Sequence, residues 1–358
     1  MRTIHSEQKI KGLLRMVAAQ GASDLHLTVG RYPTLRIDGK LVSINQNNIL
    51  TPADTRDIGD AIINEKEKEK LIKNGHVDFS YNLEDKVRFR VNAFFQQGYL
   101  SLAFRLIPKE IKTLKDLNIP EILYDITNCT QGLFLVVGPV GHGKSTTLAA
   151  LINEINHRQE KNIITIEDPI EYVYEQDKCI INQREVFQDA RSFDAALQAV
   201  FREDANVVLL GEMRDLETIS TAITAAETGH LIFGTLHTND AAQTIDRIID
   251  VFPSHQQNQI KAQLANSLLG VFSQRLVIGV DGGRVPAFEI MIKNHAVANL
   301  IREGKNYQID NVIETSLDQK MISLDRSLAD LVKKGLVTVE AAKAFAKDSN
   351  NFQNFINH

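Results

Sequence analysis

The stretch LFLVVGPVGHGKSTTL, residues 133–148, decides the fold of this chain. Its first five residues, Leu133–Val137, are apolar and too short for a core helix, so they predict a buried strand. Residues 138–145 match the pattern G-x-x-x-x-G-K-[ST], and an amphipathic run from Thr146 to His157 predicts a helix directly after it. A strand, a glycine loop and a helix in this order predict a phosphate-binding P-loop.

The residue types of this loop suit a nucleoside triphosphate. Glycines let backbone N–H groups curl around a phosphate without a Cβ in the way, and the helix N-terminus adds partial positive charge. Lys144 can reach the β- and γ-phosphates, and the Ser145 hydroxyl can bind Mg²⁺. The alternative is a glycine-rich turn before an ordinary helix. We expect ATP and Mg²⁺ as ligands, with the imidazole of His142 facing solvent. The expected nucleotide-binding residues are Gly138, Pro139, Val140, Gly141, His142, Gly143, Lys144, Ser145 and Thr146.

The composition is that of an ordinary globular protein with a large core. The length of 358 residues favours about two domains, and 43% of the residues are hydrophobic. The net charge of -5 and the absence of tryptophan argue against nucleic acid as a partner. Two cysteines, Cys129 and Cys179, are too few for a disulfide framework or a four-cysteine zinc site, so we expect both to be buried. Because no apolar run reaches membrane-spanning length, we expect a cytoplasmic protein without direct membrane insertion.

Residues 1–108 predict a compact α+β domain. Helical spacing of apolar residues predicts a helix over 6–20, and a second helix is predicted over 52–73, with the alternating charges of residues 65–70 on a solvated face. Alternation with period two predicts the strands of one antiparallel sheet. These strands are 23–29, 34–42 with a turn at Asp38–Gly39, and runs that start at Asp78, Val87 and Leu100. The polar, proline-bearing stretch 109–120 is the expected linker.

Residues 121–358 predict a doubly wound α/β domain of the P-loop NTPase kind, because apolar strands alternate with helical patterns. The predicted strands are 133–137, 162–166, 207–210, 231–234 and 275–280. The predicted helices are 145–158, 192–204, 215–228, 240–250 and 254–271. Several short helices, from about residue 295 to the C-terminus, complete the chain.

Polar residues follow three of these strands, where ATP hydrolysis needs carboxylates for Mg²⁺ and water. Glu167-Asp168-Pro169-Ile170-Glu171 follows the second strand, Glu212 the third and His237 the fourth. Glu212 comes after a fully apolar strand and predicts a Walker B acid, and His237 is a candidate sensor of the γ-phosphate. Asp215 is either a helix cap or a functional residue. His230 is a weaker candidate than His237.

Four segments closely resemble the boxes of the secretion ATPase superfamily, and within it the retraction ATPases of type IV pili. They are GPVGHGKST (138–146), TIEDPIEY (165–172), LLGEMRDLETISTAITAAETGH (209–230) and LIFGTLHTNDAAQTIDRIIDVFP (231–253). The segments ASDLHLTVG, RFRVNAF and FRLIP resemble the family's N-terminal PAS-like domain, and residues 296–303 resemble a helix motif of retraction motors. The resemblance covers nearly the whole chain and implies a RecA-like ATPase domain after the PAS-like domain.

The resemblance also implies roles for single residues. Glu171 would activate water, Glu212 and Ser145 would lie at the metal, and Arg90 and Arg105 would reach the nucleotide. Without the resemblance, both arginines read as surface residues on strands. His142 departs from the family, which usually has serine or threonine there.

The implied function is a homohexameric motor that hydrolyses ATP and powers pilus retraction. It would act on an inner-membrane platform protein from the cytoplasmic face of the membrane. The alternatives are an accessory subunit with little hydrolysis, a pilus extension or type II secretion ATPase, and a helicase. Two cysteines argue against the four-cysteine zinc insertion of the extension ATPases, and the acidic net charge argues against a helicase.

Overall fold

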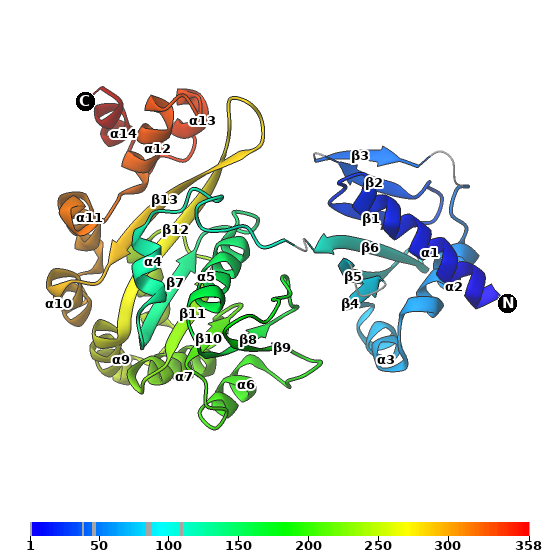
Figure 1. Ribbon diagram of the computed structural model, residues 1–358, viewed down its shortest axis with the longest axis horizontal. Helices are drawn as coiled ribbons and strands as arrows, with labels where there is room; N and C mark the ends of the chain where they lie inside the picture. Colours follow the sequence, from blue (N-terminus) through cyan, green and yellow to red (C-terminus); the bar gives the residue numbers. More distant parts are fainter. Residues whose placement is uncertain (1, 38, 45–47, 84–86, 108–109, 358) are drawn as a thin grey trace. The chain divides into compact units, whose positions relative to one another are not determined.

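The computed structural model describes residues 2–37, 39–44, 48–83, 87–107 and 110–357, and the chain divides into two compact units (Figure 1). The first unit consists of Met1–Glu110 together with Pro169–Val173, and the second of Ile111–Asp168 and Tyr174–His358. Residues 108 and 109, where the predicted first domain ends and the predicted linker begins, lie outside the described residues. So does Asp38 of the predicted turn.

The first unit is built on a six-stranded antiparallel sheet with the strand order β3-β2-β1-β6-β5-β4. Its strands are β1 (Asp24–Leu27), β2 (Thr34–Ile37), β3 (Lys40–Ser43), β4 (His76–Leu83), β5 (Val87–Gln96) and β6 (Tyr99–Ile107). Its helices are α1 (Arg2–Ala19), α2 (Pro52–Ile62) and α3 (Glu65–Asn74). Apolar side chains of the helices and of alternate strand positions form one core, in which Leu14, Phe89 and Phe104 are fully buried. The predicted α+β unit is therefore confirmed.

The predicted helix over residues 52–73 is wrong in one respect, because it is two helices. Ile63 is extended, and Asn64 begins α3 with a capping box: its side chain accepts from the Glu67 N–H, and the Glu67 carboxylate accepts from the Asn64 N–H. This reciprocal cap stabilises a new helix start inside a continuous helical pattern. It also buries Glu67, which the sequence places on a solvated face.

The second unit is built on a seven-stranded sheet with the strand order β13-β12-β7-β11-β10-β8-β9, in which only the edge strand β13 is antiparallel. The strands are β7 (Gly132–Val137), β8 (Asn162–Glu167), β9 (Ile180–Glu185), β10 (Val207–Leu210), β11 (Leu231–Leu236), β12 (Leu268–Ile278) and β13 (Arg284–Ile292). The helices around it are α4 (Ile122–Thr127), α5 (Lys144–Arg158), α6 (Phe193–Val200), α7 (Leu216–Glu227), α8 (Ala241–Asp250) and α9 (Ser254–Ser267). The central strands β7, β10 and β11 are buried at every position, as expected for parallel strands covered on both faces. The predicted α/β domain is confirmed.

Three details of this sheet differ from the sequence prediction. The helix predicted to residue 271 ends at Ser267, and the strand predicted from residue 275 begins at Leu268. The apolar run at the junction suits either element, and pairing with β7 and β13 decides for the strand. β9 and β13 were not predicted. β9 is a polar edge strand without an apolar pattern, and β13 carries Pro286, which an edge strand tolerates.

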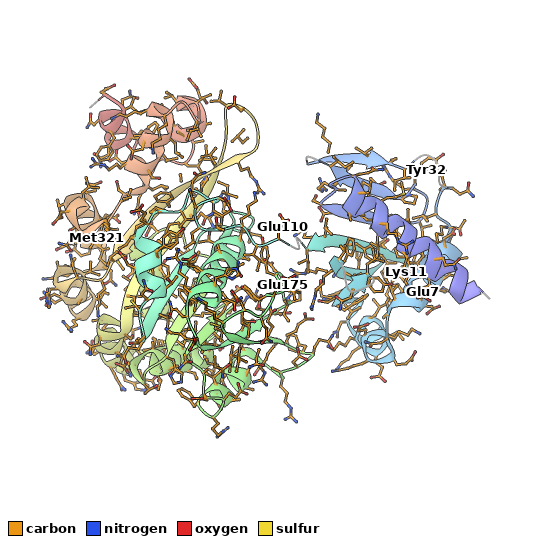
Figure 2. The ribbon with its side chains drawn as sticks, in the orientation of Figure 1. Glu7, Lys11, Tyr32, Glu110, Glu175 and Met321 are labelled. Carbon is orange, nitrogen blue, oxygen red and sulfur yellow. The ribbon has the colours of Figure 1, made fainter. Side chains whose placement is uncertain are left out.

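The chain ends in short helices, as predicted from about residue 295. They are α10 (His295–Glu303), η1 (Asn306–Gln308), α11 (Ile309–Thr315), η2 (Leu317–Gln319), α12 (Leu324–Lys333), α13 (Val339–Lys343) and α14 (Ser349–Asn357). Met321, labelled in Figure 2, is fully buried in the main core of the second unit. A smaller core joins α12, α13 and α14 to β12 and β13 through Val277, Leu328 and Phe352. Cys179 is buried as expected, but Cys129 is only partly buried. In the described part of the chain, no helix has the length and apolarity needed to cross a bilayer.

Candidate active site

Four neighbouring parallel strands deliver the predicted site loops to one edge of the second sheet. In the order β7, β11, β10 and β8, their carboxyl ends lead into the P-loop, His237, Glu212 and the Glu167-Asp168 pair. Parallel neighbours present their carboxyl ends on the same side, which is where open α/β sheets bind ligands. The strand order therefore places His237 between the P-loop and Glu212.

At two positions the P-loop combines a positive φ with a close approach of β12, and both features favour glycine over a residue with a Cβ. Gly138 has φ 142° and Gly143 has φ 84°. A Cβ at Gly138 would lie 2.5 Å from the backbone oxygen of Gln274, and one at Gly143 would lie 2.8 Å from the Gln274 amide nitrogen. Gly143 is also the N-cap of α5 and contributes no side chain to cap the helix. The first turn of α5 thus has backbone N–H groups that a phosphate can accept from, so the cradle fits the ligand expected there.

Lys144 begins α5 and is buried, with 7% of its surface exposed. Its Nζ donates to the carbonyl oxygens of Gly138 at 2.7 Å and Pro139 at 3.1 Å, and lies 3.3 Å from Nδ1 of His237. A lysine ammonium can only donate, so Nδ1 must be the unprotonated nitrogen of that imidazole. The proton of the neutral ring is then on Nε2, which lies 3.3 Å from Oε1 of Glu212. Lys144, His237 and Glu212 form one row of polar side chains in contact.

Glu212 follows β10 and is held as a carboxylate. Burial opposes its ionisation, but the ion pair with Arg214 and the nearby His237 outweigh burial and lower the pKa of Glu212. Its side chain keeps 18% exposure, so the carboxylate is still accessible. A charged acid at this strand end is the group expected to bind a metal ion. Ser145 lies in the first turn of α5. Among the described residues, no three acidic, histidine or cysteine side chains gather closely enough to hold a metal without other ligands.

Two alternatives left open by the sequence are decided by the geometry. Asp215 is the N-cap of α7, and its Oδ1 accepts from the Thr218 N–H at 2.8 Å, so the cap interpretation is confirmed. His230 comes just before β11, at the opposite end of that strand from His237. Its Nδ1 lies 3.1 Å from the Ala225 oxygen, and its ring meets Phe201 edge-on. His230 therefore lies outside the row formed by Lys144, His237 and Glu212.

His142 does not face solvent as the sequence suggested. Its Nδ1 accepts from the Leu276 N–H at 2.9 Å, because β12 runs beside the loop, and Arg284 of β13 donates to the Gly141 oxygen at 3.1 Å. Burial, together with the charges of Arg275, Lys144 and Arg284, lowers the pKa of His142 and keeps the ring a neutral acceptor. The tip of the P-loop is thus attached to the β12–β13 hairpin.

The sequence reading missed the residues of β12 that support the loop. The Gln274 side chain accepts from the Thr147 hydroxyl at 2.6 Å, and the buried Arg275 donates to the Asn239 oxygen at 2.8 Å. These contacts join β12 to α5 and to the loop after β11. The signal that could have found them is the polar triplet Ser273-Gln274-Arg275 inside an otherwise apolar strand. Buried polar side chains in a central strand need partners, and here the partners are the site loops.

The other predicted catalytic residues belong to the first unit. Arg90 on β5 and Arg105 on β6 are directly opposite each other in the sheet. Arg105 pairs with Asp24 at 3.0 Å, and Arg90 lies 3.8 Å from Asp78. Glu171 is exposed in the segment 169–173 that groups with this unit. The structure brings the two arginines together in one sheet, and the catalytic roles of Arg90, Arg105 and Glu171 stay predictions.

Comparison with known proteins gives the following matches. The family model described as "Type II/IV secretion system protein" matches residues 4–282, more than half of the chain. The type IV pilus retraction ATPase PilT of Pseudomonas aeruginosa is 46% identical over 96% of this chain and 99% of its own length. A twitching motility protein of Neisseria gonorrhoeae is also 46% identical, over 96% of this chain and 91% of its own. A crystal structure of the pilus retraction motor PilT with bound ADP superposes with a TM-score of 0.90 at 46% identity, covering 96% and 99% of the two chains.

Proposed function

Because the chain belongs to the type II/IV secretion system protein family, we propose that it is the ATPase that powers retraction of type IV pili. The observation that carries the proposal is the row Lys144–His237–Glu212 beside the glycine cradle, in a chain that is 46% identical to a retraction ATPase over nearly its whole length. The reaction is hydrolysis of ATP to ADP and phosphate. The ADP in the PilT crystal structure supports nucleotide binding by this chain.

The P-loop would hold the phosphates. In this proposal, residues 138–146 supply backbone N–H groups, and the Lys144 ammonium exchanges its carbonyl partners for phosphate oxygens. The Ser145 hydroxyl and the Glu212 carboxylate would hold Mg²⁺, which neutralises phosphate charge when it is bound. Glu171 would activate the attacking water, and Arg90 and Arg105 would contact the nucleotide, within one chain or from a neighbouring chain.

His237 has a specific part in this proposal because it lies between Lys144 and Glu212. A direct pair between the lysine and the acid would make each compete with the phosphate or the metal for its partner. With the imidazole between them, the lysine keeps a donor contact, and Nε2 lies 3.3 Å from Oε1 of the carboxylate, whose two oxygens also pair with Arg214. His237 would therefore orient both charged groups. When Lys144 moves to a phosphate, the imidazole would transmit this movement to the Glu212 carboxylate.

The assembly and location follow the family. We propose a homohexamer in the cytoplasm, bound peripherally at the inner face of the cytoplasmic membrane, where it acts on the pilus platform protein. Residues 1–108 would be the PAS-like domain, with a linker at 109–120 before the RecA-like domain. The high identity to PilT over full length supports the retraction role.

A complementation experiment tests the proposal. The chain is expressed in a bacterium that lacks its own retraction ATPase, and surface pili and twitching zones are measured, with Lys144→Ala as the matched inactive control. We expect the wild type, and not the variant, to restore twitching and to release phosphate from ATP in the purified state. No restored twitching in this host, together with restored pilus assembly in a second host that lacks its extension ATPase, would favour an extension ATPase. Retraction that needs a second ATPase, with negligible hydrolysis by this chain, would favour an accessory subunit.

A further inference from the structure

The turn at residues 345–348, between α13 and α14, contacts two of the loops of the candidate active site. Phe345 meets the His142 ring of the P-loop edge-on, with ring centroids 6.0 Å apart at 72°. Two residues later, the Lys347 ammonium lies 3.4 Å from Asp240, which begins α8 three residues after His237. One short segment near the C-terminus therefore reaches residues from two different loops.

Lys347 holds the start of α8 through two carboxylates. Asp240 caps α8 with Oδ1, which accepts from the Gln243 N–H at 2.8 Å, and its Oδ2 faces Lys347. Glu289 of β13, which is 2% exposed, accepts from the Ala241 N–H at 2.9 Å with Oε1, and its Oε2 lies 3.6 Å from the same ammonium. When Glu289 is ionised, its buried carboxylate needs a compensating charge, and Lys347 supplies it. Removal of this cation would weaken the two hydrogen bonds, to Asp240 and to Glu289, that hold the loop carrying His237 at the start of α8.

The turn itself is held in a fixed shape. The backbone N–H of Lys347 donates to Oδ1 of Asp325 at 2.7 Å, and that of Asp348 donates to Oδ2 at 2.9 Å. Asp325 lies in the first turn of α12 and is 4% exposed. Asp310 of α11 binds the Lys347 ammonium at 2.8 Å. Because α11 and α12 both hold the turn, a displacement of the C-terminal helices would move Phe345 and Lys347 together.

We propose that residues 345–348 form a positioning element of the ATPase. Phe345 holds the P-loop in position through His142. Lys347 holds the His237 loop in position through Asp240 and Glu289. The inference rests on the proposed function, since it assumes ATP hydrolysis at this site. It assigns two separate effects to two neighbouring residues. Phe345 acts on nucleotide affinity, because the P-loop binds phosphate in the ground state. Lys347 acts mainly on turnover, because its loop carries His237, which contacts the Glu212 carboxylate as well as Lys144.

The test compares Phe345→Ala and Lys347→Met with Lys343→Met, which removes an exposed lysine of α13 in the same region. The full chain is used for kcat and KM in phosphate release, Kd for Mg-ADP by calorimetry, and thermal unfolding. We expect Phe345→Ala to raise Kd and KM about tenfold with a smaller change in kcat, and Lys347→Met to lower kcat about tenfold with a smaller change in Kd. Lys343→Met should match the wild type. Phe345→Tyr and Lys347→Arg, which keep the ring and the charge, should recover most of each loss.

The outcomes separate this inference from the proposed function. Unchanged kcat and KM in both variants, beside an active wild type, would overturn the inference and leave the function intact. Equal losses of affinity and turnover in both variants, in proportion to a fall in unfolding temperature, would overturn it too, because they indicate general destabilisation. If Phe345→Ala does not fold, Phe345→Leu keeps the apolar volume, and the same rise in Kd is expected. A wild type that neither binds Mg-ADP nor hydrolyses ATP would refute the proposed function, and the inference with it.

Discussion

Substitution of His237 separates the two contacts that join the P-loop to Glu212. Nδ1 lies 3.3 Å from the Lys144 ammonium, and Nε2 lies 3.3 Å from the Glu212 carboxylate. Asparagine places its amide close to the position of Nδ1, glutamine reaches the position of Nε2, and alanine reaches neither. Hydrogen bonds to charged groups contribute about 1.5–3 kcal/mol. Both distances are long and the ring is 41% exposed, so we assign each contact about 1 kcal/mol, which corresponds to about fivefold in a rate or an affinity.

The expected results differ between the variants. His237→Asn loses the contact to Glu212, so kcat for phosphate release falls about fivefold while Kd for Mg-ADP stays near the wild-type value. His237→Gln loses the contact to Lys144 instead and changes Kd by a similar factor. His237→Ala loses both contacts and shows both changes. Steady-state phosphate release and calorimetry measure these quantities, and thermal unfolding checks the fold. Wild-type kcat in His237→Asn, or an Ala variant no worse than either amide variant, would refute the reasoning.

Two further predictions concern stability. Burial raises the pKa of Glu289 from 4.5 to about 7, so the native state binds a proton that the unfolded chain has lost, and the stability that Glu289 contributes falls as pH rises through this window. The stability of the wild type relative to Glu289→Gln, from urea unfolding, should therefore drop by up to ~3 kcal/mol from acidic to neutral pH, and a constant difference would show that the carboxyl is not perturbed. Gly141→Ala and Gly143→Ala both place alanine at positive φ, 80° and 84°, and each should lower the free energy of unfolding by about 1 kcal/mol. Gly143→Ala should lower it by about 1 kcal/mol more, because its Cβ displaces the Gln274 amide from Thr147, whereas nothing lies within 4 Å of a Cβ at Gly141. Equal losses in the two variants would argue against a stabilising contact between Gln274 and Thr147.

The local parts of the site could be predicted from the sequence because they depend on neighbouring residues. The strand before Gly138, the loop and the helix from Lys144 form a contiguous stretch, and apolar periodicity and glycine spacing specify all three. The Asp215 cap could be named as an alternative for the same reason, since a cap acts within one helical turn.

The parts that the sequence could not specify depend on contacts between distant segments. Lys144 and His237 are 93 positions apart, and only the strand order places them together. His142 read as a solvent-facing residue because its partner, the Leu276 N–H, is on a strand whose start the sequence misplaced. No local pattern marks Lys347, because nothing near it in the chain reveals the buried Glu289. Sequence patterns predict periodicity and helix caps. They do not predict which buried charges pair, because the fold of the sheet decides this.

The central claim is that this chain binds a nucleotide in the glycine cradle through Lys144. Titration of the purified chain with Mg-ADP in a calorimeter tests it most directly, with Lys144→Ala measured under the same conditions. The account predicts saturable binding by the wild type and loss of that binding in Lys144→Ala, which removes the ammonium but leaves the backbone of the loop. Absence of binding to the wild type, or equal affinity in the variant, would contradict it.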